Sequence, residues 1–418
     1  MIINIPKGTK DVLPSESGKW QYLEELARNV ARAYNLSEVR TPTFEHTELF
    51  SRSVGDATDI VNKEMYTFED KGGRSITLKP EGTAGVARCY IENGMGSLPQ
   101  PVKMYYFTPV FRYERPQAGR LREHRQFGVE IYGDADAGRD AECIAVADAF
   151  LKKAGVKDLH LFINSVGCPD CRPAYNAALK KYFTDNIDKI CETCRERLNK
   201  NPLRILDCKA EGCRGIIAGA PKTTDSVCGS CAGHFEKLQR TLGLLGVVFT
   251  VNPGVVRGLD YYTRTVFEFV TGSIGAQSTV CGGGRYDSLI GQLGGAPTPA
   301  VGFGLGLERL LLLLENTGVS AGAQSRLDAY VAGFDTGLAA AARLTAELRS
   351  AGLCAETEYG ERSLKSQLKY AQKAGARFSV IIGPDEAASG IFTLRDMDTS
   401  EERKVPADAV AEMIQNKK

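Results

Sequence analysis

The chain has 418 residues, of which 43% are hydrophobic and 25% are charged, and its formal net charge is +1. This length allows about two or three domains, and the composition is ordinary for a soluble globular protein. Because positive and negative charges nearly balance, the chain as a whole does not have the excess of positive charge that would attract nucleic acid. The balance does not exclude a local basic patch. The sequence does not begin with a charged leader and an apolar run, and its longest leucine run, Leu310–Leu314, is too short to span a bilayer. We therefore expect a cytoplasmic protein without a membrane segment.

The N-terminal part of the chain shows both helix and strand signals. Residues 16–34 have the spacing of an amphipathic helix, and a second helix is expected near residues 142–154. Between them, strand-like segments lie around residues 75–79, 102–114 and 126–132. The last two segments flank a polar loop, which predicts a hairpin with a long connection.

This hairpin, residues 102–133, carries many charged side chains. Side chains alternate between the two faces of a strand, so Arg112 is expected to share a face with Glu114. On the returning strand, Gln126 is expected to share a face with Glu130. A guanidinium can bind two phosphate oxygens at once, so arginines around the loop suit phosphate contacts; the alternative is a solvated sheet face. The loop arginines are Arg115, Arg120, Arg122 and Arg125.

Eight of the twelve cysteines are concentrated between residues 168 and 231. Three of their four close pairs have the C-x-x-C spacing of zinc sites, and eight thiols suffice for two four-cysteine sites. Disulfides are not expected in the cytosol. Residues 168–240 also contain 13 Lys+Arg against 9 Asp+Glu, a local surplus of +4. The candidate zinc ligands are Cys168, Cys171, Cys191, Cys194, Cys208, Cys213, Cys228 and Cys231.

The stretch RGLDYYTRTVFEF, residues 257–269, begins with a polar group and continues as a strand. From Thr263 onward, the alternation of β-branched and aromatic residues with others is typical of a strand. A buried sheet edge does not need a polar group at its entry, whereas a pocket for a small polar molecule does. The alternative is a satisfied surface turn. The polar group comprises Arg257, Asp260, Tyr261 and Tyr262.

A third informative stretch is AVGFGLGLERLLLLL, residues 300–314. Its small residues allow a strand and a helix start to approach closely, and a helix N-terminus offers free N–H groups and partial positive charge. Arg309 would lie in the first turns of that helix. The stretch contains neither a P-loop nor a Gly-x-Gly-x-x-Gly motif, so it does not support nucleotide binding by those routes. The alternative is a packed helix with one exposed arginine.

The C-terminal part has a different pattern. Residues 316–325, NTGVSAGAQS, are small and polar and are the best candidate for a linker. Beyond it, short apolar strands alternate with helices, which predicts a separate small α/β domain. Residues 326–418 contain 13 Lys+Arg against 14 Asp+Glu, so this part of the sequence has no excess of positive charge that would indicate RNA binding.

Taken in order, these stretches resemble the class II aminoacyl-tRNA synthetases, and among them the histidyl-tRNA synthetase family. The hairpin is similar to motif 2 of that class and residues 300–314 to motif 3. The stretches RGLDYYTRTVFEF and CGGGRYDSLIGQLGG, residues 281–295, are similar to two histidine-specific signatures. LKPEGTAGVAR, residues 78–88, and the opening PKGTKDVLP also fit, so the resemblance covers essentially the whole chain.

The resemblance implies an α+β fold with three parts. A class II catalytic core, an antiparallel sheet flanked by helices, would occupy residues 1–325. A small cysteine-rich insertion domain would interrupt it at residues 168–240. An α/β anticodon-binding domain would follow at residues 326–418.

The resemblance also implies an enzyme, a histidine–tRNA ligase. It would join L-histidine to ATP as an adenylate and then pass the histidyl group to the 3′-end of histidine tRNA. Its partners would be histidine tRNA, L-histidine, ATP with Mg²⁺ as substrate, and a second copy of the chain in a homodimer. The attacking carboxylate is already ionised at neutral pH, so the first step needs alignment and positive charge rather than a base.

By the same resemblance, the catalytic residues are three arginines. Arg112 would contact the α-phosphate, Arg257 would reach that phosphate and the histidine carboxylate, and Arg309 would hold the γ-phosphate end. The implied ATP-binding residues are Arg112, Glu114, His124 and Arg309. The implied histidine-binding residues are Glu81, Gly82, Thr83, Gln126, Glu130, Arg257, Tyr261 and Tyr262.

Three points stay open in the sequence. His124 occupies a position where relatives have a phenylalanine that stacks on adenine, and an imidazole is smaller and carries a pH-dependent charge. The cysteine spacing favours structural zinc, whereas zinc is not part of the family pattern. A non-catalytic relative, the histidine-sensing subunit of ATP phosphoribosyltransferase, shares the core but typically lacks the signature at residues 257–268 and the C-terminal domain, both of which this chain has.

Overall fold

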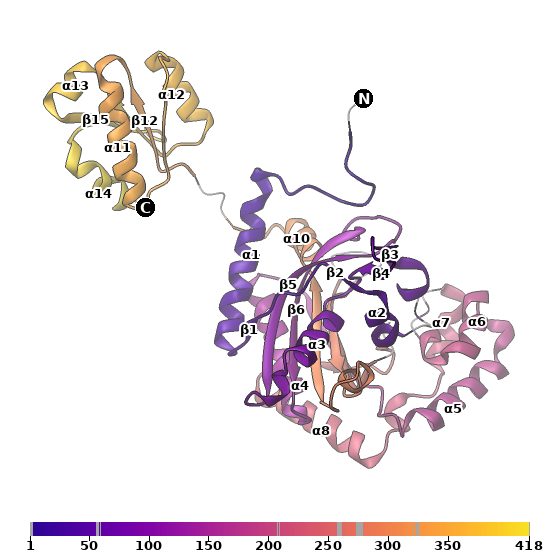
Figure 1. Cartoon of the computed structure of the whole chain (residues 1–418). Coiled ribbons are helices and arrows are strands. Elements are labelled where there is room, and N and C mark those ends of the chain that lie inside the picture. The colour runs from indigo at the N-terminus through magenta and orange to yellow at the C-terminus, as the bar shows by residue number, and fades with distance from the viewer. Residues whose placement is uncertain are drawn as a thin grey trace. The chain divides into compact units, whose positions relative to one another are not determined.

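The computed structural model describes residues 3–55, 58, 60–206, 208, 210–256, 261–272, 279–319, 321–322 and 326–417. The chain divides into two compact units, Met1–Ala323 and Gln324–Lys418, and each has its own sheet (Figure 1). The division falls inside the small, polar segment at residues 316–325.

The first unit is built around an eight-stranded sheet. From β5 through β7 neighbouring strands pair antiparallel, whereas the short edge strands β1 and β8 run parallel to their neighbours. The predicted antiparallel core is therefore confirmed, and the two edges make the sheet mixed. In spatial order the strands are β1 (Ser37–Glu38), β5 (Val102–Phe111), β6 (Glu123–Tyr132), β11 (Ala300–Gly306), β10 (Thr279–Arg285), β9 (Thr263–Thr271), β7 (Leu159–Ser165) and β8 (Thr250–Val251).

One face of this sheet is covered by a layer of helices. On β6, Phe127, Val129 and Ile131 are buried in the core that this layer forms with the sheet. Because side chains alternate along a strand, Gln126 and Glu130 face the opposite side, and their predicted common face is confirmed. The helices of the layer are α1 (Pro14–Ala33), α4 (Ala137–Lys153), α8 (Gly229–Leu244) and α10 (Leu307–Asn316).

The opposite face of the sheet carries a second core, rich in tyrosine. Tyr106, Tyr132 and Tyr286 are buried there against the helices α3 (Thr83–Glu92) and α9 (Leu289–Gln292). Next to α3 lie the helix α2 (Thr47–Val54) and a three-stranded antiparallel sheet. The strands of this small sheet are, in spatial order, β2 (Phe44–His46), β4 (Ser75–Leu78) and β3 (Tyr66–Glu69).

A buried ion pair joins the helix layer to the sheet. Asp140 on α4 and Arg285 at the end of β10 both have fully buried side chains, and their charged groups approach to 2.5 Å. Asp140 also accepts a hydrogen bond from the Thr265 hydroxyl at 2.5 Å and lies 2.7 Å from the ring nitrogen Nε2 of His234 on α8. Asp140 and its three partners lie on four different elements, so these contacts link α4 and α8 to β9 and β10.

Between β7 and α8 the chain forms a group of three helices, drawn in magenta to pink in Figure 1. They are α5 (Arg172–Asp185), α6 (Glu192–Lys200) and α7 (Glu211–Ala218). This insertion has a small hydrophobic core of its own, which includes Tyr175, Leu179, Phe183, Cys194 and Cys213.

The second unit is the predicted α/β domain. Strands β12, β13 and β14 are parallel, and β15 and β16 extend the sheet antiparallel. The predicted alternation of short strands with helices is confirmed. Strand β16 and helix α13 were not predicted from the sequence. The strands, in spatial order, are β13 (Ala355–Thr357), β12 (Ala329–Gly333), β14 (Phe378–Ile382), β15 (Ile391–Asp396) and β16 (Glu402–Pro406), and the helices are α11 (Leu338–Ser350), α12 (Leu364–Lys373), α13 (Pro384–Ser389) and α14 (Val410–Gln415).

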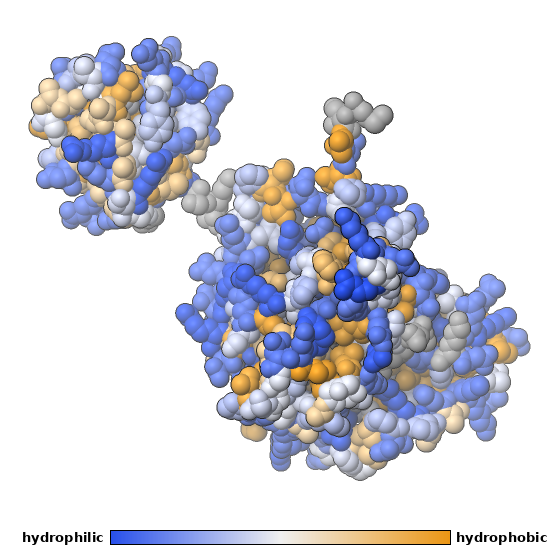
Figure 2. Space-filling model, viewed as in Figure 1, coloured by the Kyte–Doolittle hydropathy of each residue, from blue (hydrophilic) through white to orange (hydrophobic). Residues whose placement is uncertain are grey.

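The surface of the chain is mostly polar on the face that Figure 2 draws, where hydrophobic side chains occur in small groups between hydrophilic ones. Among the residues that the structure describes, no helix has both the length and the apolar character needed to cross a membrane.

Candidate active site

A polar cavity of about 520 Å³ lies along strands β9, β10 and β11, beside the hairpin of β5 and β6. All the residues that the resemblance assigns to ATP line it, namely Arg112, Glu114, His124 and Arg309. The structure thus brings together side chains from distant parts of the chain. The third predicted catalytic arginine, Arg257, lies outside the described residues. The remaining lining residues are Gly119, Arg120, Leu121, Gly254, Val255, Val256, Glu268, Thr279, Val280, Cys281, Gly282, Gly304, Gly306 and Glu308.

Arg112 and Glu114 reach the cavity from a turn rather than from a strand. The expectation that the strand continues to Glu114 is wrong, because β5 ends at Phe111. The backbone N–H of Glu114 donates to the carbonyl oxygen of Arg112 at 2.7 Å, and this tight turn ends the strand. The Arg112 side chain donates from Nε to the Pro80 carbonyl oxygen at 2.7 Å, which holds its guanidinium near the start of α3.

Positive charge is crowded at the Arg309 side of the cavity. Burial, together with the nearby charge of Arg120, lowers the pKa of the Arg309 guanidinium. A lowered pKa means that the surroundings of Arg309 disfavour the charged form of its guanidinium. An anion bound between the two guanidinium groups would relieve that cost, so the site is suited to a negatively charged ligand.

The four loop arginines do not act as one group. Arg120 contacts the carboxylate of Glu114 and lines the cavity. Arg122 instead lies over the Tyr113 ring, 3.8 Å from its centre, and Arg125 lies over an aromatic ring on α1. Within the described ranges, Arg120 is the only one of the four that lines this cavity, and phosphate binding by the other three stays a prediction.

Two ionisable groups of the cavity have strongly perturbed pKa values. Burial and the nearby charge of Arg112 lower the pKa of His124 to about 3, so its ring is neutral at physiological pH. The pH-dependent charge expected at this position is therefore absent. Burial raises the pKa of Glu308 to about 7, while both of its carboxylate oxygens accept the backbone N–H of Arg125 at 2.9 Å. Glu308 was not predicted as a site residue, and its only signal was its position next to Arg309.

A second polar group surrounds Glu130, whose side chain is fully buried. The hydroxyl of Thr83 donates to Oε1 at 2.8 Å, the hydroxyl of Tyr106 donates to the same oxygen at 3.1 Å, and the hydroxyl of Tyr286 donates to Oε2. Burial raises the pKa of Glu130 to about 8. When it is ionised, a carboxylate has about four lone-pair positions, so in that form one remains for a further donor.

The start of α3 contributes the next part of this group. Glu81 is buried, and its carboxylate oxygens accept the backbone N–H groups of Thr83 and Ala84, both at 2.7 Å. Negative charge at this point complements the free N–H groups and the dipole of the helix. The amide oxygen of Gln126 accepts the backbone N–H of Gly82 at 3.2 Å, which links β6 to the same helix start.

Tyr261 and Tyr262 complete the predicted histidine-binding set within the described residues. Both are buried, their ring centres are 4.8 Å apart, and the Tyr261 ring lies 5.3 Å from that of Tyr286. Through Tyr286 they adjoin Glu130. Tyr106 and Tyr286 were not predicted as site residues, because the partners of Glu130 depend on how the strands pair and not on any local motif.

Two glycines make room for this arrangement. A Cβ atom at Gly302 would overlap the carboxylate of Glu130, and a Cβ atom at Gly128 would overlap the hydroxyl end of Tyr106. Any larger residue at these positions would displace the buried carboxylate or the hydroxyl that binds it. A glycine on β11, Gly302, and one on β6, Gly128, are therefore required by the group that they border.

A mostly antiparallel sheet that carries an arginine-lined cavity beside a buried group of polar side chains is the architecture of the class II aminoacyl-tRNA synthetases. Residues 8–310 match the family model described as Histidyl-tRNA synthetase, and residues 328–417 match the one described as Anticodon binding domain. The chain belongs to the histidyl-tRNA synthetase family.

Individual relatives are similar over their whole length. The chain is 52% identical to the histidine–tRNA ligase of Caldanaerobacter subterraneus subsp. tengcongensis, with 100% of each chain covered. It is 51% identical to that of Acetivibrio thermocellus, over 98% of this chain and 99% of the relative. The crystal structure of apo histidyl-tRNA synthetase from S. aureus matches with a TM-score of 0.84 and 39% identity, over 99% of this chain and 100% of that one.

Proposed function

We propose that this chain is a histidine–tRNA ligase, which activates L-histidine with ATP and transfers the histidyl group to the 3′-end of histidine tRNA. The observation that carries the proposal is that the arginine-lined cavity adjoins the buried polar group around Glu130, which we propose as the amino-acid pocket. Gly304 lines the cavity, and a Cβ atom there would lie 2.8 Å from the side-chain nitrogen of Gln126, which belongs to the pocket. An amino acid in the pocket would therefore present its carboxylate to a phosphate in the cavity.

The cavity would hold ATP through charge. Arg112 would contact the α-phosphate and Arg309 the γ-phosphate end, and Arg257 would reach both the α-phosphate and the histidine carboxylate. The neutral, flat ring of His124 would stack on adenine. These roles use the fixed charge of guanidinium groups and their two-point binding of phosphate oxygens.

Aminoacyl-tRNA synthetases use ATP with Mg²⁺, and the donor set of this cavity fits that ion. Glu114 and Glu268 line the cavity and offer carboxylate oxygens, which are the ligands that Mg²⁺ prefers. When bound, the ion would neutralise part of the phosphate charge.

The first chemical step would rest on alignment rather than on a base. The histidine carboxylate is ionised at neutral pH and attacks the α-phosphorus, while pyrophosphate leaves. Negative charge grows on the phosphoryl oxygens in the transition state, and Arg112 would stabilise it there. The Pro80 carbonyl accepts a hydrogen bond from Arg112 Nε at 2.7 Å, and this contact helps to hold the guanidinium beside the cavity.

Selection of histidine would depend on Glu130. A neutral imidazole has one donor and one acceptor, so its pocket must supply an acceptor and a donor. In its ionised form, Glu130 has one lone-pair position left after its three hydroxyl donors, and in that form it would accept the imidazole N–H. A hydroxyl of Tyr261 or Tyr262 would donate to the other ring nitrogen. An amino acid without this pair would leave buried polar groups unsatisfied and would be rejected by roughly 10⁴-fold.

The remaining parts would serve the tRNA and the assembly. We propose that the second unit binds the anticodon of histidine tRNA and that the insertion contacts the acceptor arm. A homodimer is proposed as well, and Phe44 and Phe68 are exposed on one face of the small sheet where a second copy could bury them. Because tRNA and ATP meet in the compartment of translation, we place the enzyme in the cytoplasm.

The test is aminoacylation of purified tRNA by the full-length chain. Labelled histidine should become attached to a histidine tRNA transcript, and a transcript for another amino acid should stay uncharged. Charging of neither transcript by a folded, ATP-binding protein would contradict the proposal. Light scattering of the same sample measures the mass and so tests the homodimer.

A further inference from the structure

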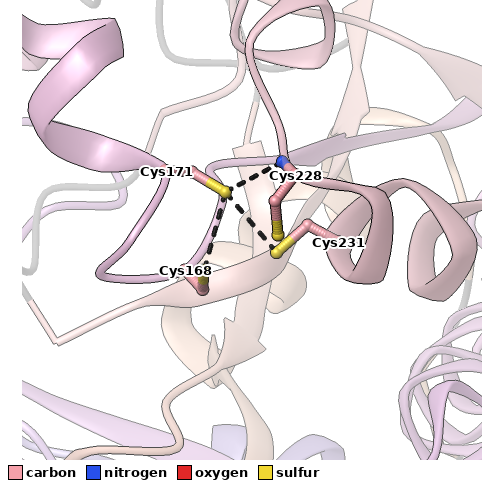
Figure 3. A group of neighbouring side chains, drawn as sticks. All are labelled: Cys168, Cys171, Cys228 and Cys231. Atoms are coloured by element: carbon pink, nitrogen blue, oxygen red, sulfur yellow. Dashed lines mark hydrogen bonds between the residues drawn. The ribbon is translucent and has the colours of Figure 1, made fainter.

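The insertion contains two clusters of four thiols, which the active site does not use. In each cluster all four sulfur atoms lie within 4.8 Å of one another. Figure 3 shows the first cluster, in which Cys168 and Cys171 face Cys228 and Cys231. The second cluster consists of Cys191, Cys194, Cys208 and Cys213.

We propose that each cluster is a structural zinc site with four thiolate ligands. A tetrahedral Zn²⁺ with Zn–S bonds of about 2.3 Å requires sulfur–sulfur distances of about 3.8 Å. The sulfur of Cys171 lies 3.5 Å from that of Cys168 and 3.9 Å from that of Cys231. In the second cluster, the sulfurs of Cys191 and Cys208 lie 3.8 Å apart. These distances match the edges of such a tetrahedron, whereas a disulfide needs a sulfur–sulfur distance of about 2.05 Å.

The ligand chemistry selects the metal. All four donors in each cluster are soft thiols, which favour Zn²⁺ over hard ions such as Mg²⁺ or Ca²⁺. Backbone N–H groups already point at the sulfurs: that of Cys228 donates to the sulfur of Cys171 at 3.1 Å, and that of Cys191 donates to the sulfur of Cys213 at 3.2 Å. Such hydrogen bonds stabilise bound thiolates and orient them.

The second cluster lies between the two halves of the first along the sequence, so the two sites cross-link different parts of the insertion. The first site, here called the root site, joins the chain just after β7 to the start of α8, so it closes the two ends of the insertion against each other. The second, the inner site, ties the start of α6 to α7 inside the small core of the insertion. A helical segment with so small a core needs such cross-links to be stable.

Metal content of the full-length chain tests the proposal. The protein should be purified without a metal-binding tag, and mass spectrometry should find about two zinc ions per chain. Cys171→Ser and Cys213→Ser should each lose one ion, and the double variant should lose both. Cys354→Ser is the matched control, since Cys354 is exposed and outside the clusters, and it should keep both ions.

A second measurement serves if a variant folds poorly. Chelator-stripped wild-type protein should be titrated with Co²⁺, whose absorption spectrum reports tetrahedral thiolate coordination. Saturation at two equivalents supports both sites. Less than half a zinc ion per chain with no thiolate–cobalt band, an iron–sulfur absorption in place of zinc, or retention of both ions in Cys171→Ser and Cys213→Ser would overturn the proposal.

Discussion

Replacing Glu130 by glutamine should change stability and activity in opposite directions. Burial raises the pKa of Glu130 from its ordinary value of 4.5 to about 8 in the folded chain. The folded state therefore holds this proton more tightly than the unfolded chain does. The resulting stabilisation is complete below pH 4.5 and is lost as the pH rises through about 8.

The size of this effect follows from the pKa. At 1.36 kcal/mol per pKa unit, a rise from 4.5 to about 8 corresponds to about 5 kcal/mol of folding free energy, which is an upper bound for the change across that interval. A Glu130→Gln variant keeps the shape but cannot ionise. Its stability relative to wild type should therefore increase steadily between pH 5 and pH 8.5. The same substitution removes the carboxyl group that is proposed to bind the imidazole, so it should lower kcat/KM for histidine by roughly 10- to 100-fold.

The assay compares unfolding temperatures of the ligand-free proteins across this pH interval, together with histidine-dependent pyrophosphate exchange. Glu92→Gln is the control, because the Glu92 side chain is 66% exposed and its substitution should leave the pH dependence unchanged. Parallel stability curves for wild type and Glu130→Gln would refute the reasoning about burial. Unchanged histidine activation would refute the assigned role in selection.

Three further substitutions test other parts of the structure. Arg309→Ala should lower adenylate formation ~100-fold or more while histidine binding, measured by calorimetry, stays within an order of magnitude. Gly302→Ala should abolish histidine binding because its methyl group overlaps Glu130, whereas Gly243→Ala, which meets open space, should not. Asp140→Ala removes one of the two carboxylates that pair with the buried Arg285, Asp287 being the other, and should cost about 3–5 kcal/mol in denaturant unfolding; a loss below 1 kcal/mol would contradict that role.

Much of the fold could be predicted from local patterns. The alternation along β6 placed Gln126 and Glu130 on one face, and the structure confirms it because the intervening residues are buried on the other. The end of β5 could not be predicted in this way. It depends on a turn at Arg112, and residues on both sides of that turn are equally compatible with a strand.

The site was predicted from the resemblance and not from periodicity. No local pattern brings Arg309 to Arg112, because their meeting depends on the order of the strands in the sheet. The two tyrosine partners of Glu130, Tyr106 and Tyr286, were missed for the same reason, since their contact with Glu130 depends on strand pairing. The neutral state of His124 is a consequence of burial, which the sequence does not reveal.

The cysteines show a similar limit. Their spacing indicated two four-thiol sites, but it did not determine which pairs combine. The structure joins the first pair to the fourth and the second pair to the third. That nesting depends on where the ends of the insertion meet, which only the folded chain defines.

Amino-acid-dependent exchange of pyrophosphate into ATP tests the central claim most directly. It measures adenylate formation alone, without tRNA, and each standard amino acid can be offered singly to the full-length protein. We predict exchange with L-histidine and background levels with every other amino acid. Exchange of equal rate with a different amino acid, or none with histidine in protein that binds ATP, would contradict the account.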